Sequence, residues 1–470
     1  METKTVRPFG LRDKIGYAMG DFGNNFTFLF ASMWLLTFGT DVLGLPGTII
    51  GLITAVCKIV DAFTDFGMGR ICDTAKPTPE GRFRPWIKRA AIPMGISSML
   101  IYQHWVANFP EPARIVWLVV VYILWGSIFY TACNIPYGSM ASVITNDPAE
   151  RTQLSTWRTI GATLSGMSIG IIAPMLVFGR NEAGQQIVVP ERFTITAIIF
   201  GILAAVLYLG CYKLTTERIQ IAPAKPGEKD RLSVGETLKN LVTCRPLLAI
   251  IAVALLTLIA SLGTQALNTY LYKDYFNDTS LMPVASFGGT AIMILMAPVA
   301  TKMSAKFGKK EVGVAGILIA AVAMFVLWIM KATSPVMYIP VYLISSLGMG
   351  LNSMVTWAYI GDVIDFQEVK TGVRTDGTVY STYSFVRKIA QAAAAGLGGF
   401  LISAIGYVSS TAGEVVVQSE ATKAALYNCM TLLPAVLYLL TFLCLAFLYP
   451  LGKKQVDENT RILTERRAAK

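Results

Sequence analysis

Histidine is nearly absent from this chain of 470 residues, and its cysteines are few and scattered. A single histidine, His104, excludes His-based catalytic triads and multi-His metal sites. The seven cysteines form no CxxC pair and mostly occupy apolar runs, so we interpret them as small buried hydrophobic residues rather than disulfide or zinc ligands. The sequence also contains no nucleophile–base motif and no nucleotide-binding loop. It therefore predicts neither an enzyme nor a bound metal or cofactor.

Charge is the second scarce property. Charged residues make up 15% of the chain and hydrophobic residues 54%, and the mean hydropathy is +0.55. A soluble protein usually has about a quarter charged residues, and disordered chains are more polar still. The composition therefore predicts a polytopic membrane protein. The N-terminus has charges but no short apolar region ending in a cleavage site, so we expect no removable signal peptide.

Twelve apolar segments are long enough to cross a bilayer, whose core of ~30 Å requires about 20 residues per helix. We place them at residues 16–40, 46–69, 87–108, 114–138, 155–178, 193–213, 246–271, 282–302, 311–331, 336–361, 377–406 and 425–449. The predicted fold class is an all-α polytopic membrane protein with twelve transmembrane helices.

The excess of positive charge, +11, is distributed unevenly along the chain. Thirty of the forty Lys and Arg residues fall in the termini and alternate loops, six fall in the other loops, and four lie within predicted helices. Positive residues accumulate in cytoplasmic loops. We therefore predict that both termini are cytoplasmic, and we read the charge as a sign of membrane topology rather than of nucleic-acid binding.

The longest polar interruption, residues 214–245, divides the apolar segments six and six. Short basic turns that contain glycine follow the second and the eighth segments, at equivalent places in the two halves. This weak repeat is typical of transporters built from two bundles. We predict a six-helix bundle at 1–213, a cytoplasmic loop at 214–245, a second six-helix bundle at 246–450 and a cytoplasmic tail at 451–470.

Three ionisable residues interrupt the second apolar segment, where such groups are costly and usually functional. Lys58, Asp61 and Asp65 are spaced by three and four residues, which places them on one helix face, with the two acids about 6 Å apart. Two carboxylates so close resist joint ionisation, unless a bound cation, a proton or the Lys58 ammonium balances them. This pattern predicts a cation-coupling site. The alternative is a structural Lys–Asp bridge that holds the second helix to a neighbour.

Other polar residues lie at membrane depth in the first half. Asp21, which two asparagines follow, either pairs with a cation on another helix or contacts a ligand. Asn134 lies beside Pro136, whose ring frees backbone carbonyls at a predicted helix break, although a plain kink is the alternative. Arg158 has no aspartate within reach on its own helix, so we expect a partner across the cavity.

The second half contains one cluster of basic residues and one cluster of acidic residues at membrane depth or at a helix end. Arg387 and Lys388 are flanked by small residues, and we expect them to face either an acid of the second helix or an anionic substrate; an internal salt bridge is the alternative. Three acids end the tenth segment and are predicted to form an inner gate with Arg374 or with the basic loop after the second helix. They are Asp362, Asp365 and Glu368.

Several longer motifs are familiar. They include IGYAMGDFGNNF, KIVDAFTDFGMGRICD, GRFRPWI, NIPYGSMASVITNDPAER, GDVIDFQEVKTGVR and VYSTYSFVRK. In these motifs the chain resembles, over nearly its whole length, the glycoside–pentoside–hexuronide:cation symporter family, a branch of the major facilitator superfamily. The residues of these motifs are most similar to those of the bacterial glucuronide carriers. The resemblance implies a major facilitator fold, residence in a bacterial inner membrane as a monomer, and cation-coupled sugar symport by alternating access.

The resemblance also implies a cation site at Asp61 and Asp65, with Thr131 contributing an oxygen. Thr64 stands where the melibiose permeases of this family have an asparagine between the two acids. This departure leaves both H⁺ and Na⁺ open as the coupling ion.

For the sugar, the resemblance maps onto eight residues, namely Asp21, Asn24, Asn25, Tyr130, Asn134, Arg158, Ser384 and Lys388. Asn25 and Asn134 replace the two sugar-binding aspartates of the melibiose permeases, whereas the basic positions Arg158 and Lys388 are retained. Losing two carboxylates shifts the cavity toward positive charge, which favours a uronate because arginine pairs bidentately with carboxylates. The alternatives are a neutral β-glucoside or xyloside as substrate, and a membrane sensor that no longer transports.

Overall fold

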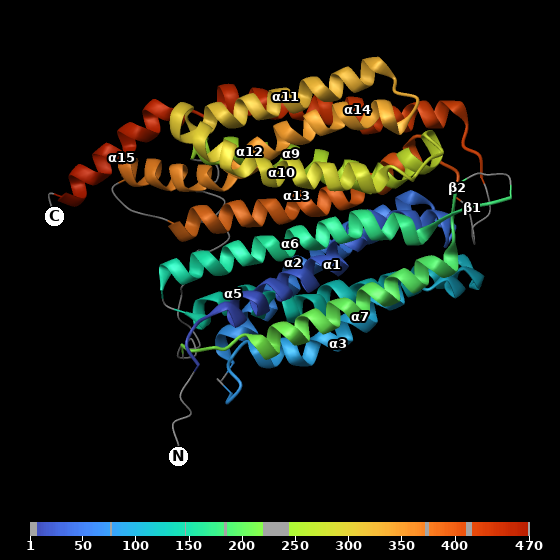
Figure 1. Ribbon diagram of the computed structural model, residues 1–470, viewed down its shortest axis with the longest axis horizontal. Helices are drawn as coiled ribbons and strands as arrows, with labels where there is room; N and C mark the ends of the chain where they lie inside the picture. Colours follow the sequence, from blue (N-terminus) through green and yellow to red (C-terminus); the bar gives the residue numbers. More distant parts are fainter. Residues whose placement is uncertain are drawn as a thin grey trace. The chain divides into compact units, whose positions relative to one another are not determined.

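The computed structural model describes residues 7–75, 78–145, 147–182, 186–219, 244–371, 376–409 and 416–468, almost entirely as helix (Figure 1). Fourteen α-helices lie within these ranges, and helices occupy every apolar segment that the sequence predicts, with ends that differ by several residues. Seven of the described helices are individually long and apolar enough to cross a bilayer, or eight if the bent helix α10 (Met282–Phe307) is one span. The fold is therefore a mostly helical, multi-pass membrane architecture, and the count of twelve spans stays a prediction.

The chain forms two compact units. Unit 1 comprises Met1–Glu228 and Ile402–Val417, and unit 2 comprises Lys229–Leu401 and Gln418–Lys470. The elements of unit 1 are α1 (Leu11–Asp41), α2 (Gly47–Thr74), α3 (Arg84–Ile101), η1 (His104–Asn108), α4 (Glu111–Ile123), η2 (Leu124–Tyr130), α5 (Thr131–Ile144), α6 (Pro148–Val177), β1 (Phe178–Arg180), β2 (Gln186–Val188) and α7 (Pro190–Leu214). Helix α1 packs against α6 and α7, and α3 packs against α7. The strands β1 and β2 form a short antiparallel hairpin that pairs Phe178 with Val188.

The elements of unit 2 are α9 (Arg245–Tyr270), η3 (Leu271–Tyr275), α10, α11 (Lys309–Met330), α12 (Pro335–Thr371), α13 (Asp376–Ala404), α14 (Glu420–Leu443), η4 (Cys444–Leu448) and α15 (Lys453–Ala468). Helix α12 packs against α10 and α11, and α14 packs against α9 and α11. The tail helix α15 has no counterpart among the predicted segments because it is polar. The Arg466 guanidinium donates to the carbonyls of Glu368 and Val369, so α15 is fixed to the end of α12.

The chain from α4 to α5 is one continuous helical stretch with a widened middle. Segment η2 is a π-helix, and α5 follows it without interruption through Pro136. The predicted helix break at Pro136 is therefore wrong. The irregular turn lies earlier, where the wider π-helical winding re-aims the side chains; such turns are frequent at functional sites.

The loop that follows α13 belongs to unit 1, although most of α13 belongs to unit 2. The Tyr407 hydroxyl donates to the buried Asp41 carboxylate over 3.1 Å, and the Ser403 hydroxyl accepts from the Thr48 amide over 2.8 Å. These polar contacts attach the last turn of α13 and the loop after it to the end of α1 and the start of α2.

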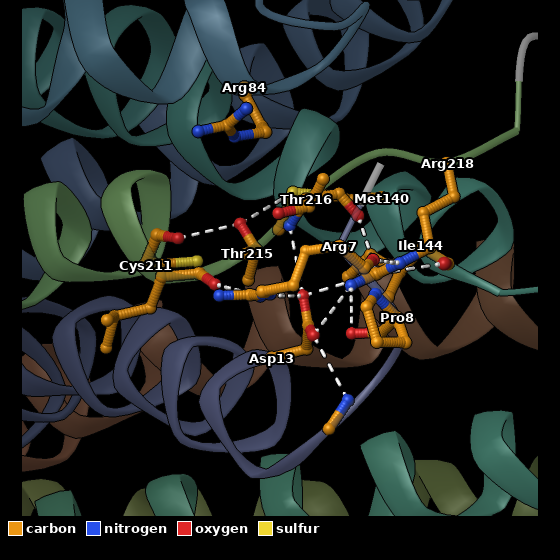
Figure 2. Close-up of polar contacts among 12 residues, drawn as sticks. Arg7, Pro8, Asp13, Arg84, Met140, Ile144, Cys211, Thr215, Thr216 and Arg218 are labelled. Carbon is orange, nitrogen blue, oxygen red and sulfur yellow. Dashed lines mark hydrogen bonds and ion pairs between the residues drawn. The ribbon is translucent and has the colours of Figure 1, made fainter. Parts of the chain in front are cut away.

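A fully buried carboxylate, Asp13, joins three segments at one end of unit 1 (Figure 2). Arg218 contacts both of its oxygens, with the shorter bond at 2.8 Å, and Arg7 lies 2.9 Å from one of them. The Thr216 amide donates to the same carboxylate. Arg218 also donates to the carbonyls of Arg7, Pro8 and Ile144, so the chain after α7 is held against the N-terminal segment and the end of α5.

Replacing Asp13 by Asn should lower the free energy of unfolding by about 3 to 5 kcal/mol, because Arg218 would remain largely buried without its counter-charge. Chemical denaturation of the purified chain in detergent measures the difference. Arg7→Gln is the matched control. The Arg7 side chain is 33% exposed, so its loss should cost less than about 1 kcal/mol. An equal loss in the two variants would contradict the role assigned to Asp13.

The same stretch also caps α3. The Glu217 carboxylate accepts hydrogen bonds of 2.7 to 2.9 Å from the backbone amides of residues 82–84, the last two residues before that helix and its first residue. Amides at a helix N-terminus lack intrahelical partners and favour a negative charge. In the adjoining loop, the hydrogen bond from Lys88 lowers the pKa of the Glu80 carboxyl.

Candidate functional site

Three charged residues of α2, namely Lys58, Asp61 and Asp65, form the α2 cluster within unit 1. The Lys58 ammonium lies 3.0 Å from one oxygen of Asp61, and both side chains are largely buried, at 17% and 14% exposure. The Thr64 hydroxyl donates to the backbone carbonyl of Asp61 over 3.1 Å, so that bond is local to the helix. Because Lys58 and Asp61 belong to the same helix, their ion pair does not join α2 to a neighbour.

Two hydroxyl groups from the α4–α5 stretch reach the acids of α2. Ser127 donates to the second oxygen of Asp61 over 2.5 Å, and Thr131 donates to Asp65 over 2.8 Å. Thr131 was expected at this site and Ser127 was not. The sequence offers one weak signal for Ser127, its position four residues before Thr131, which in an α-helix would place both on one face. Because η2 is π-helical, this spacing by itself does not establish a shared face. The two acids and two hydroxyls provide oxygen atoms of the kind that hard cations prefer.

Two aromatic rings lie close to the Lys58 ammonium. It lies 5.1 Å from the centre of the Phe28 ring on α1 and 5.9 Å from that of Trp125 on η2. The Phe28 and Trp125 rings also lie next to Tyr130, at centroid distances of 6.1 and 5.6 Å. Ring faces attract cations, most strongly where water is excluded. The cluster thus has a position for one cation, which Lys58 occupies.

The expected partner of Arg158 is Asp21. The Arg158 Nε donates to one Asp21 oxygen over 3.0 Å, which joins α6 to α1, and Asn25 donates to the other oxygen over 2.8 Å. Asp21 is 4% exposed in its side chain, whereas Arg158 is 45% exposed. Arg158 also lies over the Tyr137 ring, at 5.6 Å. Its two terminal nitrogens donate to no group among the residues that the structure describes.

The remaining sugar-site candidates of unit 1 lie around the same helices. Asn24 is buried and accepts a 2.7 Å hydrogen bond from Tyr208 on α7. Asn134 lies half-buried on α5, one turn beyond Tyr130. Unit 1 therefore carries six of the eight predicted sugar-binding residues.

The other candidates belong to unit 2. Arg387 lies half-buried on α13, whereas the side chains of Ser384 and Lys388 and all of Arg374 fall outside the described residues. Of the predicted gate acids, Asp362 is buried and forms a 2.5 Å ion pair with Lys309 at the start of α11, while Asp365 lies half-buried one turn further along α12. The inner gate stays a prediction.

The comparisons identify the class of protein. The family described as "MFS/sugar transport protein" matches residues 16–453, so the chain belongs to this family of major facilitator transporters. A protein of Salmonella typhimurium named as a candidate sulfoquinovose importer is 31% identical over 452 residues, covering 95% of this chain and 91% of that protein. A "Glucuronide carrier protein homolog" of Escherichia coli is 30% identical over 451 residues, covering 95% and 94%.

Among solved structures, a bacterial homologue of the human lysosomal transporter Spinster, in an inward-facing and unoccupied conformation, aligns with a TM-score of 0.63. It shares 14% sequence identity and covers 96% of this chain and 97% of its own, so this likeness concerns the fold alone. The family resemblance inferred from the motifs is confirmed, and the fold is of the major facilitator type. The chain is a multi-pass membrane transporter of the sugar transport family and not an enzyme.

Proposed function

We propose that this chain is a cation-coupled symporter of an anionic glycoside that works by alternating access. The observation that carries the proposal is the state of Arg158. Asp21 holds its Nε, the forked end of the guanidinium donates to no group within the described part of the chain, and no carboxylate stands at positions 25 and 134. A guanidinium fork pairs bidentately with two oxygens of a carboxylate or of a tetrahedral oxyanion such as a phosphate. The names of the two relatives denote acidic sugars, one a carboxylate and one a sulfonate.

The α2 cluster supports coupling to a monovalent cation. Asp61 and Asp65 each provide a carboxylate that can take up one H⁺ or bind one Na⁺, and the hydroxyl oxygens of Ser127 and Thr131 lie beside them. Coupling requires that cation and sugar each favour the same conformation, and the effect must be reciprocal. Under this proposal twelve helices span a bacterial inner membrane, both termini are cytoplasmic, and the monomer transports.

Competition in membrane vesicles tests the substrate class. We expect a glucuronide to inhibit uptake of a radiolabelled glycoside at a concentration at least about tenfold lower than that required of the matching neutral glucoside. The reason is that a charge-assisted pair is stronger than a neutral hydrogen bond. Counterflow with radiolabelled glycoside shows that the chain transports rather than senses. Preference for the neutral glucoside would contradict the proposal of an anionic substrate and favour a neutral one.

A further inference from the structure

The position of Lys58 is not explained by a structural role. Its ion pair with Asp61 lies within one helix and joins that helix to no other, and ordering a lysine costs side-chain entropy. Yet Lys58 is largely buried, and rings from two other elements, Phe28 of α1 and Trp125 of η2, lie close to its ammonium. The protein thus builds a desolvated position for one positive charge beside Asp61.

A coupling ion that binds Asp61 would meet this ammonium. One oxygen of Asp61 is occupied by Lys58 and the other by the Ser127 hydroxyl, which donates its proton. To serve as a ligand of a metal cation, that hydroxyl would have to turn its lone pairs toward the ion. Two positive charges within a few ångströms of one carboxylate also repel each other strongly in a site of low dielectric.

We infer that Lys58 is a tethered competitor of the metal cation at Asp61, and that it makes the wild-type chain a poor Na⁺ binder. An ammonium carries the same single charge as Na⁺ and occupies the same carboxylate oxygen. This inference rests on the proposed cation coupling, which it deepens by assigning ion selectivity to one residue.

Titration of the purified full-length chain with NaCl tests the inference, with choline chloride holding the ionic strength constant. Tryptophan fluorescence is the readout because Trp125 lies beside the position that the Lys58 ammonium occupies, so an ion bound at Asp61 would change the surroundings of its ring. We expect Lys58→Gln to bind Na⁺ at least about tenfold more tightly than the wild-type chain, since the ion no longer displaces a charge-assisted hydrogen bond. Lys58→Arg, the matched control, keeps the charge and should bind Na⁺ as weakly as the wild type.

Thermal melting provides a second readout and checks that the variants fold. A ligand stabilises the folded state by mass action, so Na⁺ should raise the melting temperature of Lys58→Gln more than that of the wild-type chain. Lys58→Met is also uncharged and is close to lysine in length. It replaces Lys58→Gln in both measurements if Lys58→Gln folds poorly, and the same gain in Na⁺ affinity is expected. Equal Na⁺ affinity in the wild-type chain and in a folded uncharged variant would overturn the inference.

The variant Asp61→Asn separates this inference from the proposed function. If Asp61→Asn loses concentrative uptake but removing Lys58 leaves Na⁺ affinity unchanged, the coupling site stands and the role of Lys58 fails. If Asp61→Asn accumulates substrate fully, the proposed coupling site itself fails, whatever Lys58 does. If Lys58→Gln gains Na⁺ binding and Lys58→Gln/Asp61→Asn loses that gain, the competition is at Asp61 as inferred.

Discussion

Replacing Asp61 or Asp65 by Asn should reduce accumulation of the sugar to equilibrium, a loss of at least about tenfold in the concentration ratio. An asparagine keeps the size and hydrogen-bonding capacity of the carboxyl but cannot gain or lose a charge, so the sugar gradient is no longer linked to the cation gradient. Downhill exchange should persist because these substitutions do not change the predicted sugar-binding residues around Arg158. Uptake and counterflow of radiolabelled glycoside in vesicles distinguish the two activities.

Glu111→Gln is the matched control for these variants. Glu111 is exposed in the first turn of α4 and lies outside the cluster, so its neutralisation should leave accumulation unchanged. Ser127→Ala should give an intermediate loss, because it removes one hydrogen bond from Asp61 and leaves the charge. Full accumulation in both aspartate variants would refute the assignment of the coupling site.

Replacing Arg158 by Ala should raise the half-saturation concentration for an anionic glycoside by about a hundredfold. Loss of one partner of a desolvated, hydrogen-bonded charge pair typically costs 2 to 5 kcal/mol, and each 1.4 kcal/mol is tenfold in affinity. For a neutral glycoside the change should stay below about threefold. Competition curves for the two glycosides, measured on the same vesicles, give the ratio directly.

Arg158→Ala also leaves Asp21 buried without its cation, so a loss of folding must be separated from a loss of binding. The double variant Arg158→Gln/Asp21→Asn removes both charges and should melt near the wild-type temperature while still failing to prefer the anionic glycoside. Arg158→Lys retains the charge but lacks the fork, and should lose about tenfold in affinity for the anionic glycoside. Equal losses for anionic and neutral glycosides would contradict the anion-binding role of Arg158.

Hydropathy located the helices well because the bilayer requires long apolar segments whatever packs around them. It could not locate α15, since a polar helix outside the membrane has no such signature, and its attachment to α12 depends on bonds from Arg466 to backbone carbonyls. The break expected at Pro136 shows a second limit. The irregular turn is η2, which contains no proline, and the helix continues regularly through Pro136.

The candidate site divides in the same way. The spacing of Lys58, Asp61 and Asp65 placed these residues together because helix periodicity fixes which side chains share a face. The pairing of Arg158 with Asp21, 137 residues apart, depends on how α6 is rotated and shifted against α1. The contact of Ser127 with Asp61 depends likewise on the register of η2 against α2.

The sequence by itself thus determined the membrane class, the positions of the apolar helices and the local charge clusters, because each follows from composition or from the geometry of one helix. Only the tertiary structure decided that Asp21 holds Arg158 by its Nε, that Asp13 joins α1 to the chain after α7, and that Lys58 lies among aromatic rings beside Asp61. The physical reason is that contacts between helices depend on their relative rotation and translation, which the period of a single helix does not encode.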